Sequence, residues 1–401
     1  MTQDIVLVGG ARTPMAEYVG TPGYGKFKDL SAIELAAIAS KAALERSRVA
    51  PELIEHVIIG NALQTSVDAL YGARHVGLKA GIPQHVPALT VNRLCGSGLQ
   101  SIVSGAQLIA LGEARCVLAG GMENMSQAPH VIYGMRSGVG FGQNQTILDS
   151  LFASLMDPVG GLYMAQTAEK VAKRLGISRE AQDEYALRSH QLGAKAVQSG
   201  RFAAEIVPVT VKGRKGDEVV STDDHIKPDT TLEGLAKLRA AFGKDGTVTA
   251  GNASGIVDGA ASVVLTTAEQ AKSGGLDVYA HVRGWAYVGV DPTEMGIGPV
   301  PAIRKVCEKA GLKLDQIDLV EINEAFSAQY LGCEKELGLD RTRCNVNGGA
   351  ISLGHPLGAS GTRLVLTLMH ELRASKKRYG VASACIGGGQ GIAVLIENTQ
   401  R

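Results

Sequence analysis

The strongest constraint on the fold is a pattern of strand, asparagine and reactive side chain that occurs twice in the chain. In the first copy, a β-branched run leads to Asn61, and Cys95 lies 34 residues later. In the second copy, a similar run leads to Asn323, and His355 lies 32 residues later. Apolar residues at helical spacing follow Cys95 and His355, and another strand pattern follows each helix. We therefore predict a duplicated α/β unit with Cys95 and His355 at equivalent strand-to-helix junctions, where open α/β sheets bind ligands.

A long insert, which differs in composition and pattern from the two copies, separates them. It contains a glycine-rich stretch at 134–142 and helical patterns at 164–199. An insert of this length indicates a lid or a ligand-binding subdomain. The predicted divisions are an N-terminal half (1–121 with 248–272), an inserted subdomain (122–247) and a C-terminal half (273–401).

Composition excludes several classes of protein. The 401 residues include 40 Lys and Arg against 39 Asp and Glu, a balance that argues against nucleic-acid or membrane-surface partners. No apolar run reaches the length of a membrane span, and the first residues resemble neither a signal peptide nor a transit peptide. The six cysteines are scattered without a CxxC pair, which fits free thiols in a reducing compartment, and the histidines show no metal-ligand spacing. We therefore expect a cytoplasmic protein without a metal site.

Cys95 is the first candidate for catalysis. It precedes a helical pattern and lies among glycines that give access to its side chain. The partial positive charge of a helix N-terminus is expected to lower the pKa of the thiol. The alternative is a small buried hydrophobe, the usual role of a free cysteine. The glycine-rich turn favours the catalytic interpretation.

His355 and Cys385 occupy two further glycine-rich turns. A neutral imidazole at His355, framed by glycine and proline, can accept a thiol proton. Cys385 opens a run of three glycines whose backbone N–H groups can form an oxyanion hole, although an ordinary β-turn between two strands fits the same residues. Asn323 could orient a water or a carbonyl, or cap a helix.

These motifs resemble the thiolase family along nearly the whole chain. The resemblance rests on five segments that occur in the same order: 92–98, 246–255, 323–326, 347–361 and 385–391. It implies two similar α/β halves that form a five-layered α-β-α-β-α core, with an inserted loop domain.

The resemblance also implies a role for each motif. Cys95 would carry the acyl group as a thioester, His355 would activate it, and Cys385 would act as acid and base at the α-carbon. Asn323 would hold a water that forms one oxyanion hole with His355, and the N–H groups of Cys95 and Gly387 would form the other. The coenzyme A (CoA) channel would be lined by Met164, Lys227, Leu238, Phe242, Ala250, Ser254, Ala325 and Phe326.

The implied activity is cleavage of a 3-ketoacyl-CoA to acetyl-CoA and a shortened acyl-CoA, reversible by Claisen condensation, as in β-oxidation. CoA and acyl-CoA would be substrates, with no permanently bound cofactor, and the family resemblance suggests a homodimer or homotetramer. The segments 162–169 and 295–301 resemble 3-ketoacyl-CoA thiolases more than acetoacetyl-CoA-forming enzymes. A biosynthetic acetyl-CoA acetyltransferase, a decarboxylating ketoacyl synthase, a non-catalytic CoA- or lipid-binding protein, and a metal or redox protein remain as alternatives.

Overall fold

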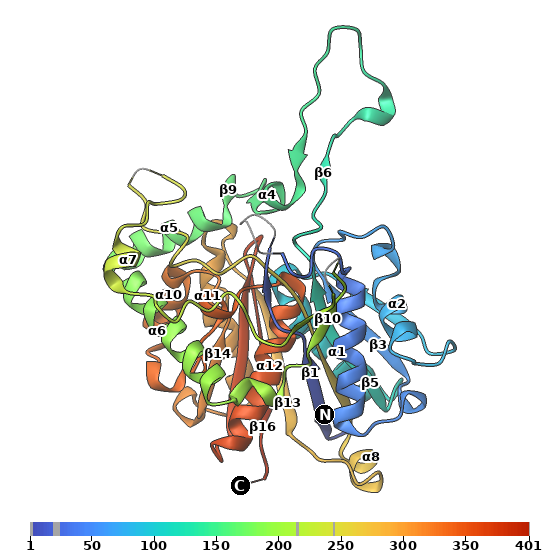
Figure 1. Cartoon of the computed structure of the whole chain (residues 1–401). Helices are drawn as coiled ribbons and strands as arrows, with labels where there is room; N and C mark the ends of the chain where they lie inside the picture. Colours follow the sequence, from blue (N-terminus) through green and yellow to red (C-terminus); the bar gives the residue numbers. More distant parts are fainter. Residues whose placement is uncertain (1–2, 19–24, 214–215, 244, 401) are drawn as a thin grey trace.

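A 10-stranded mixed sheet forms the centre of the computed structural model, which describes residues 3–18, 25–213, 216–243 and 245–400 (Figure 1). Its strands run in the order β14-β15-β16-β13-β1-β12-β5-β3-β4, and β2 (Ala16–Glu17) pairs with β12. The strands of the N-terminal half are β1 (Ile5–Arg12), β12 (Val257–Thr267), β5 (Cys116–Glu123), β3 (His56–Asn61) and β4 (Ala88–Val91). Those of the C-terminal half are β13 (Ala280–Gly289), β16 (Gln390–Glu397), β15 (Tyr379–Ile386) and β14 (Leu319–Ile322).

The strand order confirms the duplication. The series β1-β12-β5-β3 and β13-β16-β15-β14 have the same pairing, which is antiparallel, antiparallel and then parallel. Each first strand also has a bulge at the same place, between Leu7 and Gly9 in one half and between Val282 and Gly284 in the other. Since a bulge changes the register by one residue, its recurrence indicates that both strands are built to the same plan.

Buried residues divide the core into layers that match the predicted α-β-α-β-α order. The helices α3 (Ser97–Leu111) and α12 (Leu357–Ala374) form the middle layer, and their apolar residues share one cluster with strands of both halves. The helices α1 (Ala32–Ser47) and α2 (Gly72–Lys79) cover the outer face of the N-terminal half. The helices α9 (Pro299–Ala310) and α10 (Ser327–Leu337) cover that of the C-terminal half. The predicted fold class is therefore confirmed.

Glycines allow the two middle helices to touch. A Cβ at Gly98 would lie 2.5 Å from the backbone nitrogen of Thr362, and one at Gly361 would lie 2.3 Å from that of Leu99. The backbones of α3 and α12 are thus in contact near their N-termini, and any larger side chain would separate them. This contact brings together the two turns that hold Cys95 and His355.

Cys95 and His355 were predicted at equivalent strand-to-helix junctions. Both do precede a helix, but only Cys95 follows a strand. Cys95 lies in the 3₁₀ turn η3 (Leu94–Gly96), which follows strand β4 and leads into α3. His355 follows the short helix α11 (Ala350–Leu353) and not a strand. Where β4 pairs with β3 in the first half, the second half has only an isolated bridge between Val320 and Cys344 among its described residues. The prediction of a strand before His355 was therefore wrong.

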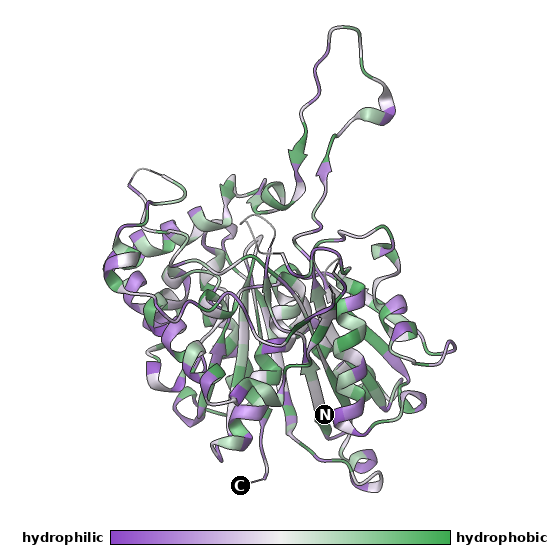
Figure 2. Cartoon of the chain, viewed as in Figure 1, coloured by the Kyte–Doolittle hydropathy of each residue, from purple (hydrophilic) through white to green (hydrophobic). Residues whose placement is uncertain are grey.

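The insert leaves the sheet after β5 and returns as the neighbouring strand β12. Figure 1 shows its first part as a long arm that projects from the body of the molecule. Helices α5, α6 and α7 lie over the C-terminal half, whereas β10 lies beside α1 of the N-terminal half (Figure 1). Figure 2 shows many hydrophilic residues on α6 and α7. Its elements are β6 (His130–Val131), β7 (Leu148–Asp149), α4 (Ser150–Ser154), β8 (Met156–Asp157), β9 (Leu162–Tyr163), α5 (Met164–Leu175), α6 (Arg179–Gln198), β10 (Val209–Val211), β11 (Glu218–Val220) and α7 (Leu232–Ala236). Helix α8 (Ala268–Ser273) follows β12. The domain limits predicted from the sequence stay a prediction.

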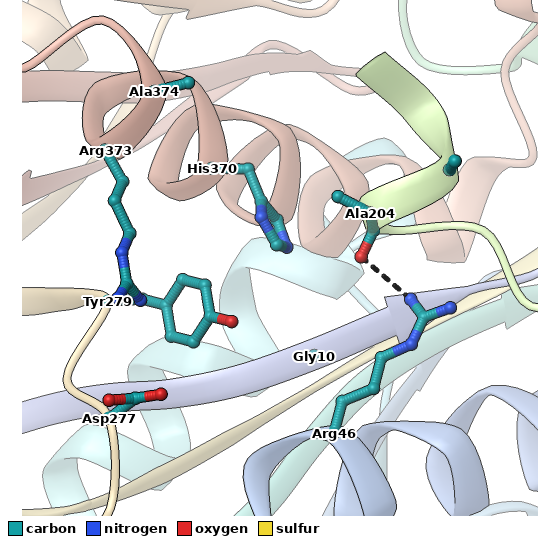
Figure 3. A pocket seen from close by; sticks show the side chains of 9 residues that line it. Gly10, Arg46, Ala204, Asp277, Tyr279, His370, Arg373 and Ala374 are labelled. Atoms are coloured by element: carbon teal, nitrogen blue, oxygen red, sulfur yellow. Dashed lines mark hydrogen bonds between the residues drawn. The ribbon is translucent and has the colours of Figure 1, made fainter. Parts of the chain in front are cut away.

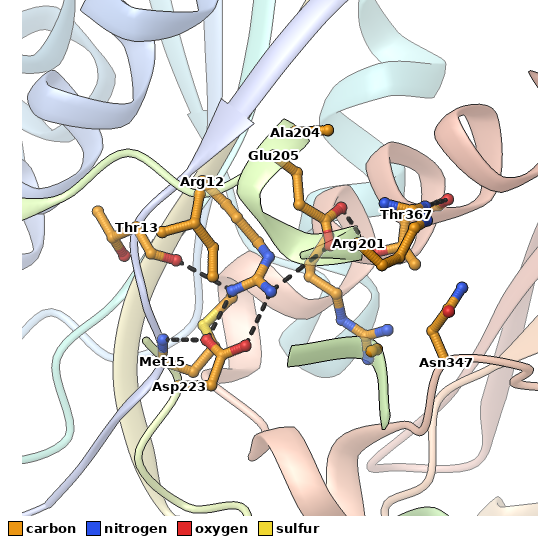
Figure 4. A network of polar contacts seen from close by, with 12 residues as sticks. Arg12, Thr13, Met15, Arg201, Ala204, Glu205, Asp223, Asn347 and Thr367 are labelled. Carbon is orange, nitrogen blue, oxygen red and sulfur yellow. Dashed lines mark hydrogen bonds and ion pairs between the residues drawn. The ribbon is translucent and has the colours of Figure 1, made fainter. Parts of the chain in front are cut away.

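A buried ionic network attaches the insert to both halves (Figure 4). The guanidinium of Arg12, on β1, donates to both carboxylate oxygens of Asp223 at 2.7 and 2.8 Å and to Glu205 at 3.5 Å. Glu205 also accepts a hydrogen bond from Thr367 of α12 at 3.0 Å. Because Arg12, Glu205 and Asp223 are buried, removal of one charge would cost about 3–5 kcal/mol.

Among the described residues, one helical stretch, Leu94–Leu111, has the length and apolarity of a membrane span, with a mean hydropathy of 1.3 over 18 residues. It contains α3, which packs between the two halves of the sheet, so its apolar character belongs to the core.

Candidate active site

The three predicted reactive side chains line one cavity of about 210 Å³. Cys95 comes from the turn before α3, and His355 from the turn before α12. Cys385 is near the end of β15. The fold thus brings together residues that lie as far as 290 positions apart in the sequence.

Two backbone N–H groups act on the thiol of Cys95 and lower its pKa. They belong to Cys95 itself and to Gly387, in the turn between β15 and β16. Leu94, directly before Cys95, has a φ of 48°, in the left-handed region that costs a non-glycine residue about 1–2 kcal/mol. Its N–H donates to the side chain of Asn92 at 2.9 Å, which holds the strained turn in place.

The pKa of Cys95 differs from the sequence-based expectation. Burial raises the pKa of the thiol to about 11, and this effect exceeds that of the two N–H donors. The prediction that the helix N-terminus lowers this pKa was therefore wrong for the unliganded cavity. The thiol is protonated at neutral pH and needs a base to become a nucleophile.

His355 has the properties of that base. Burial, and next the charge of Arg363, lower its pKa to about 3, so the imidazole is neutral at physiological pH. Its Nδ1 lies 2.5 Å from Oγ of Ser360, whose hydroxyl donates to the carbonyl of Pro356 at 3.1 Å. This arrangement assigns the proton to Nδ1. The lone pair of Nε2 accepts from Nδ2 of Asn323 at 3.3 Å.

Cys385 lies in the most apolar part of the site. It is fully buried in a cluster with Met295 and Ala325, and burial, followed by the nearby Cys95, raises its pKa well above the usual value. A thiol of this kind holds its proton firmly, and its thiolate is a strong base. The following turn contains Gly388 and Gly389 at φ 78° and 80°, so the β-turn and the site occupy the same residues.

Two further hollows extend the cavity toward the surface. The middle one, of about 370 Å³, shares Phe242, Ser254 and Phe326 with the catalytic cavity. The outer one, of about 280 Å³, shares Ala250 with the middle one. The eight residues predicted to contact CoA all line this path: Met164 and Ala325 in the cavity, Phe242, Ser254 and Phe326 in the cavity and the middle hollow, Ala250 in the middle and outer hollows, and Lys227 and Leu238 in the outer hollow.

Comparison with known proteins decides the family. Residues 5–269 match the model of the thiolase N-terminal domain, and residues 276–398 match that of the thiolase C-terminal domain. The chain belongs to the thiolase family. It is similar to the mitochondrial 3-ketoacyl-CoA thiolase of Homo sapiens, at 50% identity over 100% of this chain and 99% of that protein. It is also similar to the acetyl-CoA acetyltransferase of Escherichia coli (strain K12), at 48% identity over 98% and 99%.

Solved structures agree with the sequence comparison. The crystal structure of human mitochondrial 3-ketoacyl-CoA thiolase matches this thiolase with a TM-score of 0.96 and 51% identity, over 99% of both chains. The same human protein in complex with CoA matches with a TM-score of 0.95 and 50% identity, over 99% of this chain and 98% of that one. The protein is therefore an acyltransferase that catalyses the thiolase reaction between acyl-CoA substrates.

Sequence reasoning missed the buried groups that hold the site of this thiolase together. Glu123, at the end of β5, accepts N–H bonds from Ala62, Leu63 and Gly358, and so joins the first half to the start of α12. Glu324 accepts from the side chains of its neighbours Tyr185, Ser189 and Asn345 and from the N–H of Ile351. No local pattern in the sequence distinguishes these acids from surface acids, because only the tertiary contacts bury them.

Proposed function

We propose that this thiolase cleaves 3-ketoacyl-CoA through an acyl-thioester on Cys95. The observation that carries the proposal is that Cys95, His355 and Cys385 face one cavity at the inner end of a path lined by every predicted CoA contact. A similar human protein has been crystallised in complex with CoA, which supports CoA as the ligand of this path.

The first step forms the nucleophile. Neutral His355 accepts the thiol proton of Cys95 at Nε2, and the thiolate attacks the 3-keto carbon of the substrate. The tetrahedral oxyanion accepts hydrogen bonds from the N–H groups of Cys95 and Gly387, which both act on the thiol of Cys95. One such donor contributes about 2.7–4 kcal/mol of transition-state stabilisation in other enzymes.

The second step breaks the bond between the α-carbon and the 3-keto carbon. Its electron pair passes to the enolate of acetyl-CoA, whose oxygen is stabilised by protonated His355 and a water held by Asn323. Cys385 gives its proton to the α-carbon and becomes a thiolate.

The last step regenerates the enzyme. The Cys385 thiolate takes the proton of incoming CoA, and the CoA thiolate attacks the thioester on Cys95. The leaving Cys95 thiolate recovers its proton from His355. The same steps in reverse give Claisen condensation.

The walls of the cavity favour acyl groups longer than acetyl. Tyr163 lines the cavity, and its ring lies 4.8 Å from that of Phe152 and 5.7 Å from that of Phe242. Leu151, Leu155 and Met295 complete an apolar lining. The chain is also similar to acetyl-CoA acetyltransferases, so acetoacetyl-CoA synthesis is the second candidate function.

A thiolysis series over the chain length of 3-ketoacyl-CoA, measured beside the condensation of acetyl-CoA, tests this proposal. We expect kcat/KM to rise from acetoacetyl-CoA to longer substrates. A maximum at acetoacetyl-CoA with fast condensation would support the biosynthetic alternative.

Two surfaces support the proposed homodimer or homotetramer. Strand β4 is at one edge of the sheet, where unpaired backbone groups are available to a second copy, and Leu89 on it is 47% exposed. The arm has exposed Tyr133, Phe141 and Ile147. Light scattering on the wild type and on a chain lacking 132–146 should separate the contribution of the arm from that of the strand edge. The cytoplasmic location predicted from composition can be tested by cell fractionation.

A further inference from the structure

A separate hollow lies at the opposite end of α12 from His355 (Figure 3). It has a volume of about 570 Å³ and shares no lining residue with the cavity or the two channel hollows among the described residues. His370 and Arg373 come from the end of α12, Arg46 from α1, and Tyr279 from the segment before β13. The rise along α12 from Leu357 to His370, 13 residues later, separates this hollow from the catalytic turn by about 20 Å.

Among the described residues, neither arginine of the hollow has a carboxylate within ion-pair distance, although the buried Glu205 acts on the charge of Arg46. Arg46 donates to the carbonyls of Ala204 and Ile206 at 3.0 and 2.6 Å, and both of these partners are neutral. The guanidinium of Arg373 lies 4.7 Å from the centre of the Tyr279 ring, which is also neutral. Neutral partners position the guanidinium groups without cancelling their charge, so the hollow favours an anion.

His370 adds an unused hydrogen-bonding atom to the same hollow. Its ring meets that of Tyr279 edge-on at 5.1 Å, and its buried Nε2 has no hydrogen-bond partner among the described residues. A buried polar atom without a partner is destabilising, and a ligand that forms a hydrogen bond with it would relieve this cost. Figure 3 shows the hydroxyl of Tyr279 directed into the space between His370 and Arg46.

One acidic residue, Asp277, lies at the rim of the hollow. Its carboxylate lies 3.9 Å from the guanidinium of Arg48, outside the group formed by Arg46, His370 and Arg373. Glu205, whose charge acts on Arg46 and His370, is itself bound by Arg12 and Thr367. The hollow is therefore lined by two arginines against one aspartate.

We propose that this hollow binds a phosphate group carried by a small molecule. Donors approach from opposite walls, α1 on one side and α12 on the other, which suits a tetrahedral anion better than a planar carboxylate. Arginine is the preferred residue for phosphate because its planar fork offers several N–H donors. The volume lies within the range of about 300–1,000 Å³ that is typical of small-molecule sites, so it has room for the rest of a phosphate ester.

Isothermal titration calorimetry on the full chain at constant ionic strength tests the proposal. The probes are inorganic phosphate and adenosine 5′-monophosphate, which separate a free anion from an ester. We expect saturable binding, with the ester tighter than the free anion, and at least a tenfold loss of affinity in Arg373→Gln. Lys377→Gln also removes one positive charge, but outside the hollow, and this variant should bind both probes as the wild type does.

Two further variants distinguish binding in the hollow from binding in the CoA path and from loss of folding. Ala250→Trp fills the CoA path and should keep phosphate binding, because that path is remote from the hollow. His370→Phe keeps the ring against Tyr279 and should weaken binding while thiolysis and the unfolding temperature stay unchanged. Wild-type affinity in Arg373→Gln, loss of binding in Ala250→Trp, or no saturable binding of either probe would overturn the proposal.

Discussion

The N-terminal and C-terminal halves share a strand order, yet their corresponding asparagines have different partners. Asn61, the last residue of β3, donates to the buried carboxylate of Glu123 at 2.8 Å. Asn323, after β14, donates to Nε2 of His355 at 3.3 Å, inside the site. Asn61 therefore stabilises a buried structural carboxylate, whereas Asn323 binds a side chain of the reactive site. The duplicated frame thus supplies two equivalent positions, and the local turn decides which of them carries chemistry.

The nucleophile that the first half supplies should be the most sensitive position in the chain. Cys95→Ser should lower kcat of thiolysis by more than about 10³-fold, because the hydroxyl is a far weaker nucleophile at this pH. Steady-state thiolysis measures the loss, and mass spectrometry of the wild type with substrate should show an acyl group on Cys95. Cys307→Ala, in α9, serves as control and should keep its activity. Equal activity in the two variants would refute the acyl-thioester.

Replacement of each asparagine by alanine tests the contrast between the halves directly. Asn323→Ala should lower kcat by about 10²- to 10³-fold, the usual effect of losing an oxyanion-stabilising group. Asn61→Ala should lower the free energy of unfolding by about 1.5–3 kcal/mol, the usual contribution of a hydrogen bond to a charged group, since it removes one of the two donors to Oε1 of the buried Glu123, and should change kcat little. Kinetics and chemical denaturation on both variants measure the two effects. If Asn61→Ala lost as much kcat as Asn323→Ala, the two positions would not differ in role.

Glu123 joins the halves, and its titration should appear in the stability of the fold. Burial raises its pKa from 4.5 to about 7, so between these values the folded chain binds more protons than the unfolded chain. Stability contributed by this group is therefore present below pH 4.5 and is lost as the pH rises toward 7, by up to about 3 kcal/mol. Glu123→Gln should flatten that part of the pH profile of unfolding. An unchanged slope would show that the carboxyl does not titrate in this range.

A smaller effect on catalysis is expected when the buried positive charge of Arg363, which acts on His355, is removed. Arg363→Met removes a buried cation that lowers the pKa of His355, so this pKa should rise by less than about one unit. The acidic limb of the pH profile of kcat/KM should move to higher pH by the same amount, while Arg373→Gln at the other end of α12 should leave it in place. A shift in the opposite direction would show that Arg363 does not act on the imidazole.

Much of the fold could be predicted because its signals in the sequence are local. Strand patterns, helical spacing and glycine turns predict the repeat and place Cys95, His355 and Cys385 together. The spacing could not show that the strand before His355 is reduced to a bridge at Cys344, because strand formation there depends on a neighbouring strand. It also could not show the raised pKa of Cys95, which is caused by burial in a cavity built from distant segments.

The residues that support the site were hidden for the same reason. Glu123, Glu324 and Ser360 act through partners that only the folded chain brings close. The hollow around Arg373 is assembled from α1, η5 (Arg201–Ala204), α12 and the segment before β13, and none of these contains a motif of its own.

The shared middle layer has a consequence for how the protein is made. Helix α3 covers part of the inner face of the first half's sheet, but the rest stays uncovered until α12, residues 357–374, has been synthesised. Strand β1 must also wait for its partner β12 at residues 257–267. Nearly the whole chain therefore leaves the ribosome before its core can close. A nascent chain of this kind exposes apolar surface for most of its synthesis, which makes it a substrate for chaperones and gives the two halves a single, joint folding transition.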